Sequence, residues 1–168
     1  MKKIIIGSDK SGFYLKEAIK THLIEDGYEV EDCGTLDVES PYPFHQVAPI
    51  VAKKIQNKEY EKGILCCGTG MGMAIVANKF EGVHAAVVES VYAAEKCRAI
   101  NDANVLTMGG WIIGENMGVD IAKKFLAARH ISGVQAWTTI AKMNFVQEEF
   151  SNGKTIDDIV DITSLSKG

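Results

Sequence analysis

Short apolar runs alternate with amphipathic segments along most of this chain. The apolar runs are typical of buried β-strands and are expected at residues 3–8, 28–34, 64–66, 84–88 and 104–108. The segments between them have helical periodicity and are expected to form helices at residues 12–26, 44–56, 71–79, 90–100 and 114–128. Five such βα units predict an α/β fold, a three-layer Rossmann-like sandwich with a five-stranded parallel sheet covered by helices on both faces.

The pattern changes after Arg129. Residues 134–150 are expected to form one further helix, and residues 151–168 are expected to form a polar tail with a short helix at 155–160. We therefore divide the chain into a Rossmann-like domain at residues 1–130 and a C-terminal helix and tail at residues 131–168. This second part is expected to pack on the same domain or on a neighbouring subunit.

The composition of the chain limits the ligands, the cellular location and the kinds of cross-link that are expected. The 168 residues are 46% hydrophobic and 24% charged, and the net charge of -4 gives no sign of nucleic-acid binding. No apolar run approaches the roughly 20 residues of a membrane helix, and the first ten residues lack the apolar region of a signal peptide, so a cytoplasmic location is expected. The four cysteines have no CxxC spacing. Neither a disulfide framework nor a metal site is predicted.

The stretch from Gly63 to Asn78, GILCCGTGMGMAIVAN, combines a strand, a thiol, a glycine-rich turn and a helix. Gly68, Gly70 and Gly72 have no Cβ that would keep an anion away from the backbone N–H donors. In open parallel sheets, ligands bind outside the carboxyl ends of the strands. The segments expected to line a site are therefore residues 8–12, 67–72 and 109–114.

Cys67 is placed to take a proton from a carbon beside a carbonyl, since the N–H groups from Gly68 to Gly72 would stabilise the resulting enediolate. Thr69 offers a hydroxyl at the same place. Asp9 and Lys10 end the first strand and could orient hydroxyls and hold a negative group. The alternative is that Cys67 is a small core residue in an ordinary turn of a doubly wound protein.

Several motifs give this chain a family resemblance from Lys3 to about Leu126. They are IGSD at 6–9 with Gly12 and Leu15-Lys16-Glu17, GYEV at 27–30, Gly34-Thr35, Tyr42-Pro43, GILCCGTGMGMAIVANK at 63–79, Gly82, Tyr92, and NDANVLTMGG at 101–110 with Ile113-Gly114. With them the chain resembles the ribose-5-phosphate isomerase type B and galactose-6-phosphate isomerase subunits.

The resemblance implies a cytoplasmic aldose-ketose isomerase without a metal or other cofactor, acting on a small sugar or sugar phosphate. It implies a homodimer or tetramer whose active sites are shared between subunits. The catalytic residues would be Cys67, the base that moves a proton between C1 and C2, and Thr69. The residues expected to bind substrate are Asp9, Lys10, Tyr42, Gly68, Gly70, Met71, Gly72, Trp111 and, from the other subunit, Asn101.

Five positions depart from the family pattern. Lys10 replaces a histidine, Ile100 replaces the histidine that opens the sugar ring, and Trp111 replaces an arginine. Val134 and Trp137 fall near the places of two C-terminal arginines that bind phosphate. Ile100 can neither give nor take a proton, which favours a substrate that is already open-chain, such as a tetrose 4-phosphate. Tryptophan suits stacking on a sugar, which points to an unphosphorylated or differently substituted sugar.

These departures leave alternatives open. The substrate class includes pentose 5-phosphates, hexose 6-phosphates and tetrose 4-phosphates. The chain could be the cysteine-bearing subunit of a hetero-oligomeric isomerase that needs an unlike partner. It could also be a sugar-phosphate-binding protein without turnover, and a redox or flavin protein of flavodoxin-like fold is a weaker competitor.

Overall fold

The structure, a computed structural model, describes residues 2–131, 143, 147–149 and 151–153. The chain divides into two compact units, Met1–His130 and Ile131–Gly168. In the first unit, strands and helices alternate along the chain. They are β1 (Lys2–Ser8), α1 (Phe13–Glu25), β2 (Tyr28–Asp32), α2 (Phe44–Gln56), β3 (Gly63–Cys67), α3 (Met71–Ala77), β4 (Ala85–Val87), α4 (Val91–Ala99), β5 (Val105–Gly109) and α5 (Glu115–Ala127).

The strands form one parallel sheet in the order β2-β1-β3-β5-β4. The three central strands are therefore β1, β3 and β5, and their register places Ser8 beside Cys66 and Cys67 beside Gly109. The chain segments that follow these strands lie next to one another at the carboxyl edge of the sheet. These are the segments that the sequence singled out.

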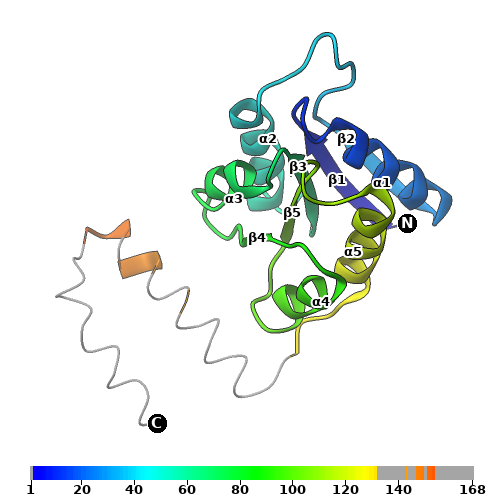
Figure 1. The fold of residues 1–168 in the computed structure, drawn as a ribbon. Coiled ribbons are helices and arrows are strands. Elements are labelled where there is room, and N and C mark those ends of the chain that lie inside the picture. Colours follow the sequence, from blue (N-terminus) through cyan, green and yellow to red (C-terminus); the bar gives the residue numbers. More distant parts are fainter. Residues whose placement is uncertain (1, 132–142, 144–146, 150, 154–168) are drawn as a thin grey trace. The chain divides into compact units, whose positions relative to one another are not determined.

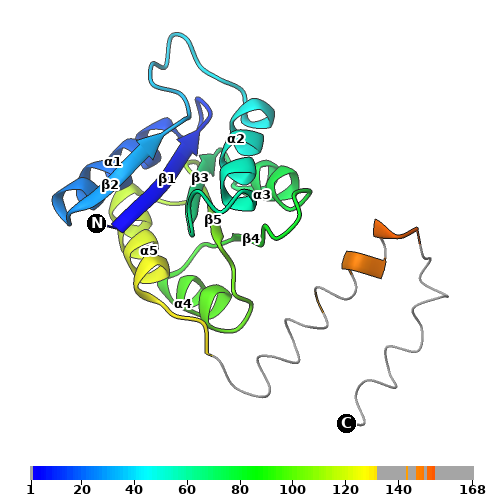
Figure 2. The same cartoon turned by 180° about the vertical axis from the view of Figure 1, so that it is seen from behind.

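Helices cover both faces of the sheet (Figures 1 and 2). The helices α1, α4 and α5 pack together on one face, and α2 and α3 pack together on the other. Each face has its own buried apolar cluster, and alternate residues of β1 serve the two: Ile4 and Ile6 enter one cluster and Ile5 the other. The predicted Rossmann-like sandwich is confirmed.

Local chemistry sets the ends of the elements. Ser90 caps α4, because its Oγ accepts a hydrogen bond from the Ala93 N–H at 3.1 Å. The strand β2 ends two residues earlier than expected, at Asp32. Gly34 has already turned against β1, where a Cβ on Gly34 would lie 2.1 Å from the Ser8 nitrogen.

The second unit is described only in part. Met143 and residues 147–149 are helical, in agreement with the helix expected at 134–150. The remainder of that helix, including Val134 and Trp137, and the short helix expected at 155–160 lie outside the described residues. Among the residues that the structure does describe, no helix has the length and apolar character needed to span a membrane.

Candidate active site

Cys67 is the last residue of the central strand β3. All of β3 is buried, and Cys67 is 5% exposed. The loop after β5 is hydrogen-bonded to the turn after β3. Gly110 donates its N–H to the Cys67 carbonyl at 2.7 Å, and Trp111 donates its N–H to the Gly68 carbonyl at 3.0 Å. Two of the three expected segments are therefore held together by their backbones.

The turn between β3 and α3 depends on the left-handed backbone of Gly70, which has φ +78°. A Cβ there would be strained, and it would also lie 3.0 Å from the backbone of Met108. This conformation directs the Gly70 N–H to Sγ of Cys67, at 3.1 Å. A donor in this position stabilises negative charge on the sulfur.

The same turn has further donors. Within the described part of the chain, the N–H groups of Gly68 and Thr69 have no hydrogen-bond acceptor. The N–H of Met71 reaches Oγ1 of Thr69 at 3.4 Å. Amide donors and a hydroxyl thus lie within a few residues of the thiol, as an anion-stabilising turn requires.

The two neighbouring cysteines have different surroundings. Cys66 belongs to the buried cluster under α1 and α5, and Cys67 to the cluster under α2 and α3. Burial raises the pKa of the Cys66 thiol, which keeps it protonated. Of the two thiols, Cys67 is the one with a backbone donor at its sulfur.

Asp9 follows β1 and is joined to the neighbouring strand, because its N–H donates to the Cys66 carbonyl at 3.2 Å. Its carboxylate accepts the Gly12 N–H at 3.0 Å. Burial raises the pKa of Asp9, and hydrogen bonds from the backbones of Gly12 and Ser11 only partly oppose this. Asp9 is therefore held at the sheet edge by both its backbone and its side chain.

Lys10 and Trp111 supply the charge and the aromatic surface at this edge. Lys10 is exposed, and it is the only cationic side chain within residues 8–12, 67–72 and 109–114, all of which the structure describes. The indole of Trp111 is 74% exposed, and one side of it lies against Gly68. A Cβ on Gly68 would lie 2.7 to 2.8 Å from three indole carbons.

Tyr42 lies in the loop between β2 and α2 and is 53% exposed. Two residues later, Phe44 begins α2 with its ring against the start of α3, where a Cβ on Gly72 would lie 3.1 Å from the ring. Two buried polar residues, Thr35 and Lys16, also lie near this loop; both belong to motifs of the family resemblance, but sequence reasoning assigned them no role in the site. The signal available for Thr35 was its place directly after a glycine at the end of a strand.

Asn101 is not brought to Cys67 within one chain. It follows α4, which returns the chain from the carboxyl end of β4 to the amino end of β5. It therefore lies at the edge of the sheet opposite Cys67, and its side chain is exposed. Its contribution from a second subunit stays a prediction.

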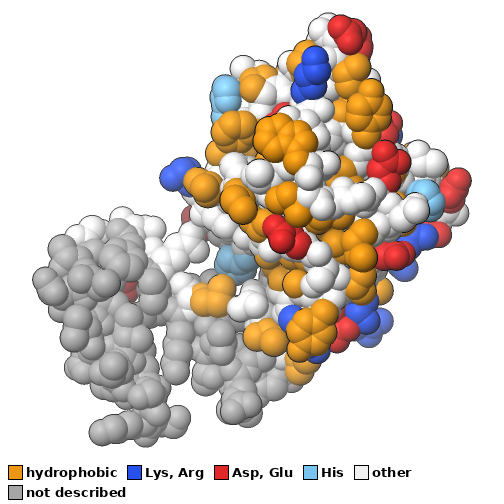
Figure 3. All heavy atoms as spheres, viewed as in Figure 1, with side chains coloured by type: hydrophobic (Ala, Val, Ile, Leu, Met, Phe, Trp, Pro, Cys, Tyr) orange, Lys and Arg blue, Asp and Glu red, His pale blue; other side chains and the backbone are white. Residues whose placement is uncertain are grey.

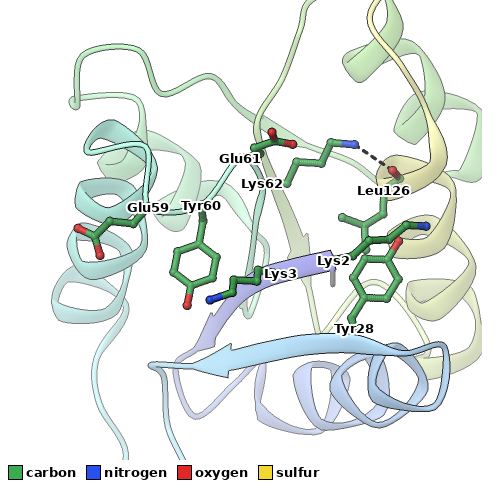
Figure 4. A pocket seen from close by; sticks show the side chains of 8 residues that line it. All are labelled: Lys2, Lys3, Tyr28, Glu59, Tyr60, Glu61, Lys62 and Leu126. Carbon is green, nitrogen blue, oxygen red and sulfur yellow. Dashed lines mark hydrogen bonds between the residues drawn. The ribbon is translucent and has the colours of Figure 1, made fainter.

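A cavity of about 440 Å³ lies at the amino ends of the strands, the edge of the sheet opposite Cys67 (Figure 4). Lys62 donates to the Leu126 carbonyl at 2.9 Å and so satisfies the C-terminal end of α5. Lys2 lies over the ring of Tyr28, 5.4 Å from its centroid. These lysines stabilise the fold, and the cavity is separate from the Cys67 edge. Its lining is Lys2, Lys3, Tyr28, Glu59, Tyr60, Glu61, Lys62 and Leu126.

Large hydrophobic side chains are exposed on the first unit, and Figure 3 shows them across one face. Ile75 of α3 is 64% exposed and Tyr92 of α4 is 73% exposed. Groups of such residues on a protein surface commonly mark interaction sites. Among the described residues, no three His, Cys, Asp or Glu side chains are grouped so that they could hold a metal ion.

Fold and site together define a doubly wound α/β protein with a thiol and amide donors at the carboxyl ends of its central strands. Comparison with known proteins is consistent with this class. The sequence profile described as "Ribose/Galactose Isomerase" matches residues 4–143. The chain is 63% identical over 135 residues to a 4-deoxy-4-sulfo-D-erythrose isomerase of Clostridium sp. (strain MSTE9), covering 80% of this chain and 85% of the relative.

Two further relatives extend the match. The chain is 42% identical over 146 residues to ribose-5-phosphate isomerase B of Escherichia coli (strain K12), covering 83% of this chain and 97% of the relative. A crystal structure of ribose-5-phosphate isomerase B from Mycoplasma genitalium with bound ribulose-5-phosphate superimposes with a TM-score of 0.81 at 33% identity, covering 88% and 97% of the two chains.

The chain belongs to the ribose/galactose isomerase family. It is an aldose-ketose isomerase, so the family and the enzyme class expected from the sequence are both confirmed. The roles of individual residues stay predictions.

Proposed function

We propose that this enzyme interconverts 4-deoxy-4-sulfo-D-erythrose and the corresponding ketose, 4-deoxy-4-sulfo-D-erythrulose. The observation that carries this proposal is Ile100, which stands where the family is expected to have its ring-opening histidine. A tetrose closes its ring through the C4 hydroxyl. With a carbon–sulfur bond at C4 that hydroxyl is absent, so the substrate is always open-chain and needs no acid or base for ring opening.

The charge available for the C4 substituent favours a sulfonate over a phosphate. The whole chain has two arginines, Arg98 and Arg129, and Arg98 is bonded to Asp102 and to the Ala103 carbonyl. A phosphate ester carries about -1.5 to -2 charges near pH 7 and is commonly gripped by several arginines. A sulfonate carries one negative charge. Lys10 alone matches that charge.

The relative with the highest identity given above supports the same substrate, because its name is that of a 4-deoxy-4-sulfo-D-erythrose isomerase. The second candidate is a tetrose 4-phosphate, which is also open-chain because its O4 is esterified. It is disfavoured by the shortage of arginine. Pentose 5-phosphates and hexose 6-phosphates form rings and would need the missing histidine.

In the proposed reaction the Cys67 thiolate takes the proton from C2 of the aldose and becomes a thiol. The electrons of the C2–H bond form the enediolate, and its charge on O1 would be stabilised by the N–H groups of Gly68 and Thr69, which have no acceptor among the described residues, beside Gly70, Met71 and Gly72. The hydroxyl of Thr69 passes the proton from O2 to O1. Cys67 then returns its proton to C1, which yields the ketose.

The remaining predicted residues would hold the substrate. Asp9 is fixed at the edge of the sheet and would accept a hydrogen bond from a sugar hydroxyl. Lys10 would pair with the anionic group, and the exposed face of Trp111 would stack on the carbon chain. Tyr42 would close the site from the loop after β2.

The active assembly is proposed to be a homodimer or tetramer with shared sites. Asn101 would reach substrate from a second subunit, which fits its position at the opposite edge of its own sheet. The exposed Ile75 and Tyr92 offer apolar surface for such contacts. We also propose a cytoplasmic location for the protein, because its four cysteines are free thiols, as is usual in a reducing compartment. Light scattering after size exclusion would measure the subunit number.

The test is proton NMR of the purified protein alone in deuterated water, with 4-deoxy-4-sulfo-D-erythrose, D-erythrose 4-phosphate and D-ribose 5-phosphate in parallel. The expected result is ketose formation with deuterium incorporation, fastest with the sulfonate and lost in Cys67→Ala. Preference for the phosphate would overturn the sulfonate proposal. No reaction with any sugar would favour the alternatives, a subunit that needs an unlike partner or a protein that only binds sugars.

A further inference from the structure

Thr35 is a fully buried residue that joins three segments of the chain at the carboxyl edge of the sheet. Its N–H donates to the Ser8 carbonyl at 2.8 Å, one residue before Asp9. Its Oγ1 accepts the N–H of Tyr42 at 3.0 Å and donates to the carbonyl of Tyr42 at 3.4 Å. One hydroxyl therefore satisfies both backbone groups of Tyr42.

Thr35 is itself held from behind by Lys16, a lysine of α1 with no exposed surface. The Lys16 ammonium donates to the Thr35 carbonyl at 2.6 Å, to Asp32 at 2.6 Å, and is paired with Glu17 at 2.8 Å. All three N–H donors of the ammonium thus have acceptors. Lys20 pairs with the same Asp32 at 2.8 Å. The position of Thr35 is consequently fixed by a buried charged network.

The other side of Tyr42 is restrained by the chain itself. Tyr42 lies between Pro41 and Pro43, so its own backbone and those of its neighbours have few allowed conformations. Phe44 then places its ring on Gly72, in the first turn of α3. The Tyr42 backbone is fixed at both ends, and its side chain is left 53% exposed.

We propose that Thr35 is a positioning residue for substrate binding that acts through Tyr42. The hydroxyl of Thr35 holds the Tyr42 backbone so that the Tyr42 side chain faces the site at the carboxyl edge, and Lys16 holds Thr35. This inference rests on the proposed function, since it requires that substrate binds beside the Cys67 turn. Neither Thr35 nor Lys16 touches substrate.

The experiment is a double-mutant cycle between Thr35 and Tyr42 in the full-length enzyme. Thr35→Val removes the hydroxyl at constant shape, and Thr35→Ser keeps it. Thr35→Val is expected to raise KM about tenfold with kcat changed by less than about threefold, and Thr35→Ser to stay near the wild type. In a Tyr42→Ala background, Thr35→Val should have no further effect on KM. A purely structural Thr35 would instead give additive effects.

Amide hydrogen exchange of Tyr42 provides a readout that needs no substrate. The Tyr42 N–H is expected to be protected in the wild type and in Thr35→Ser, and to exchange at least about tenfold faster in Thr35→Val. Should Thr35→Val fail to fold, Thr35→Ala replaces it, and an unprotected Tyr42 amide in the wild type overturns the inference without any variant.

The outcomes separate the inference from the function on which it rests. Additive effects in the cycle, or equal losses in Thr35→Ser and Thr35→Val, overturn the positioning role while the wild type still isomerises the sugar. A wild type that isomerises no sugar overturns the proposed function itself, and the inference falls with it.

Discussion

The backbone N–H of Gly70 donates a hydrogen bond to Sγ of Cys67 at 3.1 Å. Gly70 is three positions after Cys67 in the sequence, and the contact exists because Gly70 has φ +78°. Backbone donors do not move when a reaction begins, so this one is in place before charge develops on the sulfur. The left-handed backbone of Gly70 therefore places the donor that stabilises negative charge on the Cys67 sulfur.

Cys67→Ser is therefore expected to keep the fold and lose turnover. A serine hydroxyl fits the same space, but it is a far weaker base than a thiolate, and kcat/KM should fall by roughly 10²- to 10⁴-fold. Deuterium incorporation into the sugar measures the loss. Cys97→Ser, on α4 and away from the carboxyl edge, is the matched control and should leave the rate unchanged. A Cys67→Ser enzyme that keeps its activity would show that Cys67 is not the catalytic base.

Gly70→Ala should reduce both stability and activity. A left-handed alanine costs about 1–2 kcal/mol, and its Cβ would also lie 3.0 Å from the Met108 backbone. Gly27→Ala is the matched control, because Gly27 has φ +81° with no atom within 4 Å of its added Cβ. Thermal unfolding should show a loss in both variants. Activity should fall in Gly70→Ala alone, and an equal fall in both would mean that the turn geometry is unimportant for catalysis.

Trp111→Arg should shift the preference toward phosphate. A guanidinium beside Gly68 would add the charge and the paired donors that a phosphate dianion requires. The ratio of kcat/KM for D-erythrose 4-phosphate over 4-deoxy-4-sulfo-D-erythrose is expected to rise about tenfold or more. Lys10→Gln is the companion variant and should lower kcat/KM for both substrates. An unchanged ratio in Trp111→Arg would mean that Trp111 does not contact the C4 substituent.

Ile100→His should leave the open-chain substrate unaffected. Ile100 is 47% exposed at the end of α4, so the imidazole can be accommodated without repacking. The rate with 4-deoxy-4-sulfo-D-erythrose is expected to stay within about twofold, and the rate with D-ribose 5-phosphate to rise, since a ring opener has been supplied. Coupled assays of both sugars give the comparison. A gain with the sulfonated tetrose would contradict the argument from ring opening.

Asp32 makes stability depend on pH. Burial alone would raise the pKa of Asp32, but hydrogen bonds from Lys16 and Lys20 outweigh it, and the pKa is lowered. The contribution is therefore complete above the unfolded-state pKa of about 3.9 and is lost as the pH falls through the lower folded-state pKa.

Urea unfolding at pH 6 and at successively lower pH measures this dependence. Asp32→Asn should lower the free energy of unfolding by about 3 kcal/mol at pH 6, because the buried Lys16 loses a partner, and should flatten the acid-side decline. Asp37→Asn changes an exposed carboxylate and serves as the control. A decline equally steep in Asp32→Asn and in the wild type would show that the network contributes nothing to acid stability.

Periodicity and topology predicted the sheet, its helices and the three segments at the carboxyl edge. The strong signals were local, such as the five buried residues of β3 and the glycines after Cys67. The burial of Lys16 could not be predicted from these local signals. A lysine on a helix is expected in solvent, and its burial depends on Asp32 and the Thr35 carbonyl, which come from other elements.

The placement of Trp111, like the burial of Lys16, depends on contacts with residues that are distant in sequence. The sequence marked Trp111 as a departure from its relatives, but only the fold brings its indole onto Gly68, 43 positions earlier in the chain. The ring of Phe44 likewise lies against Gly72 of α3, 28 positions later in the chain. Contacts between residues far apart in sequence carry no periodic signal, and these are the contacts that shape the site.

The sheet order also governs how the chain can fold as it is synthesised. Among the strands that the structure describes, β4 pairs with β5 alone, which is made after it and is inserted between β3 and β4. The three residues of β4 therefore have no partner strand until residue 105 and those that follow have been made. One edge of β3 stays open for the same interval. The sheet can be completed only after β5 has been made, so the insertion of β5 is the last step of sheet formation. Until then the incomplete chain has unpaired strand edges and is most exposed to association with other chains.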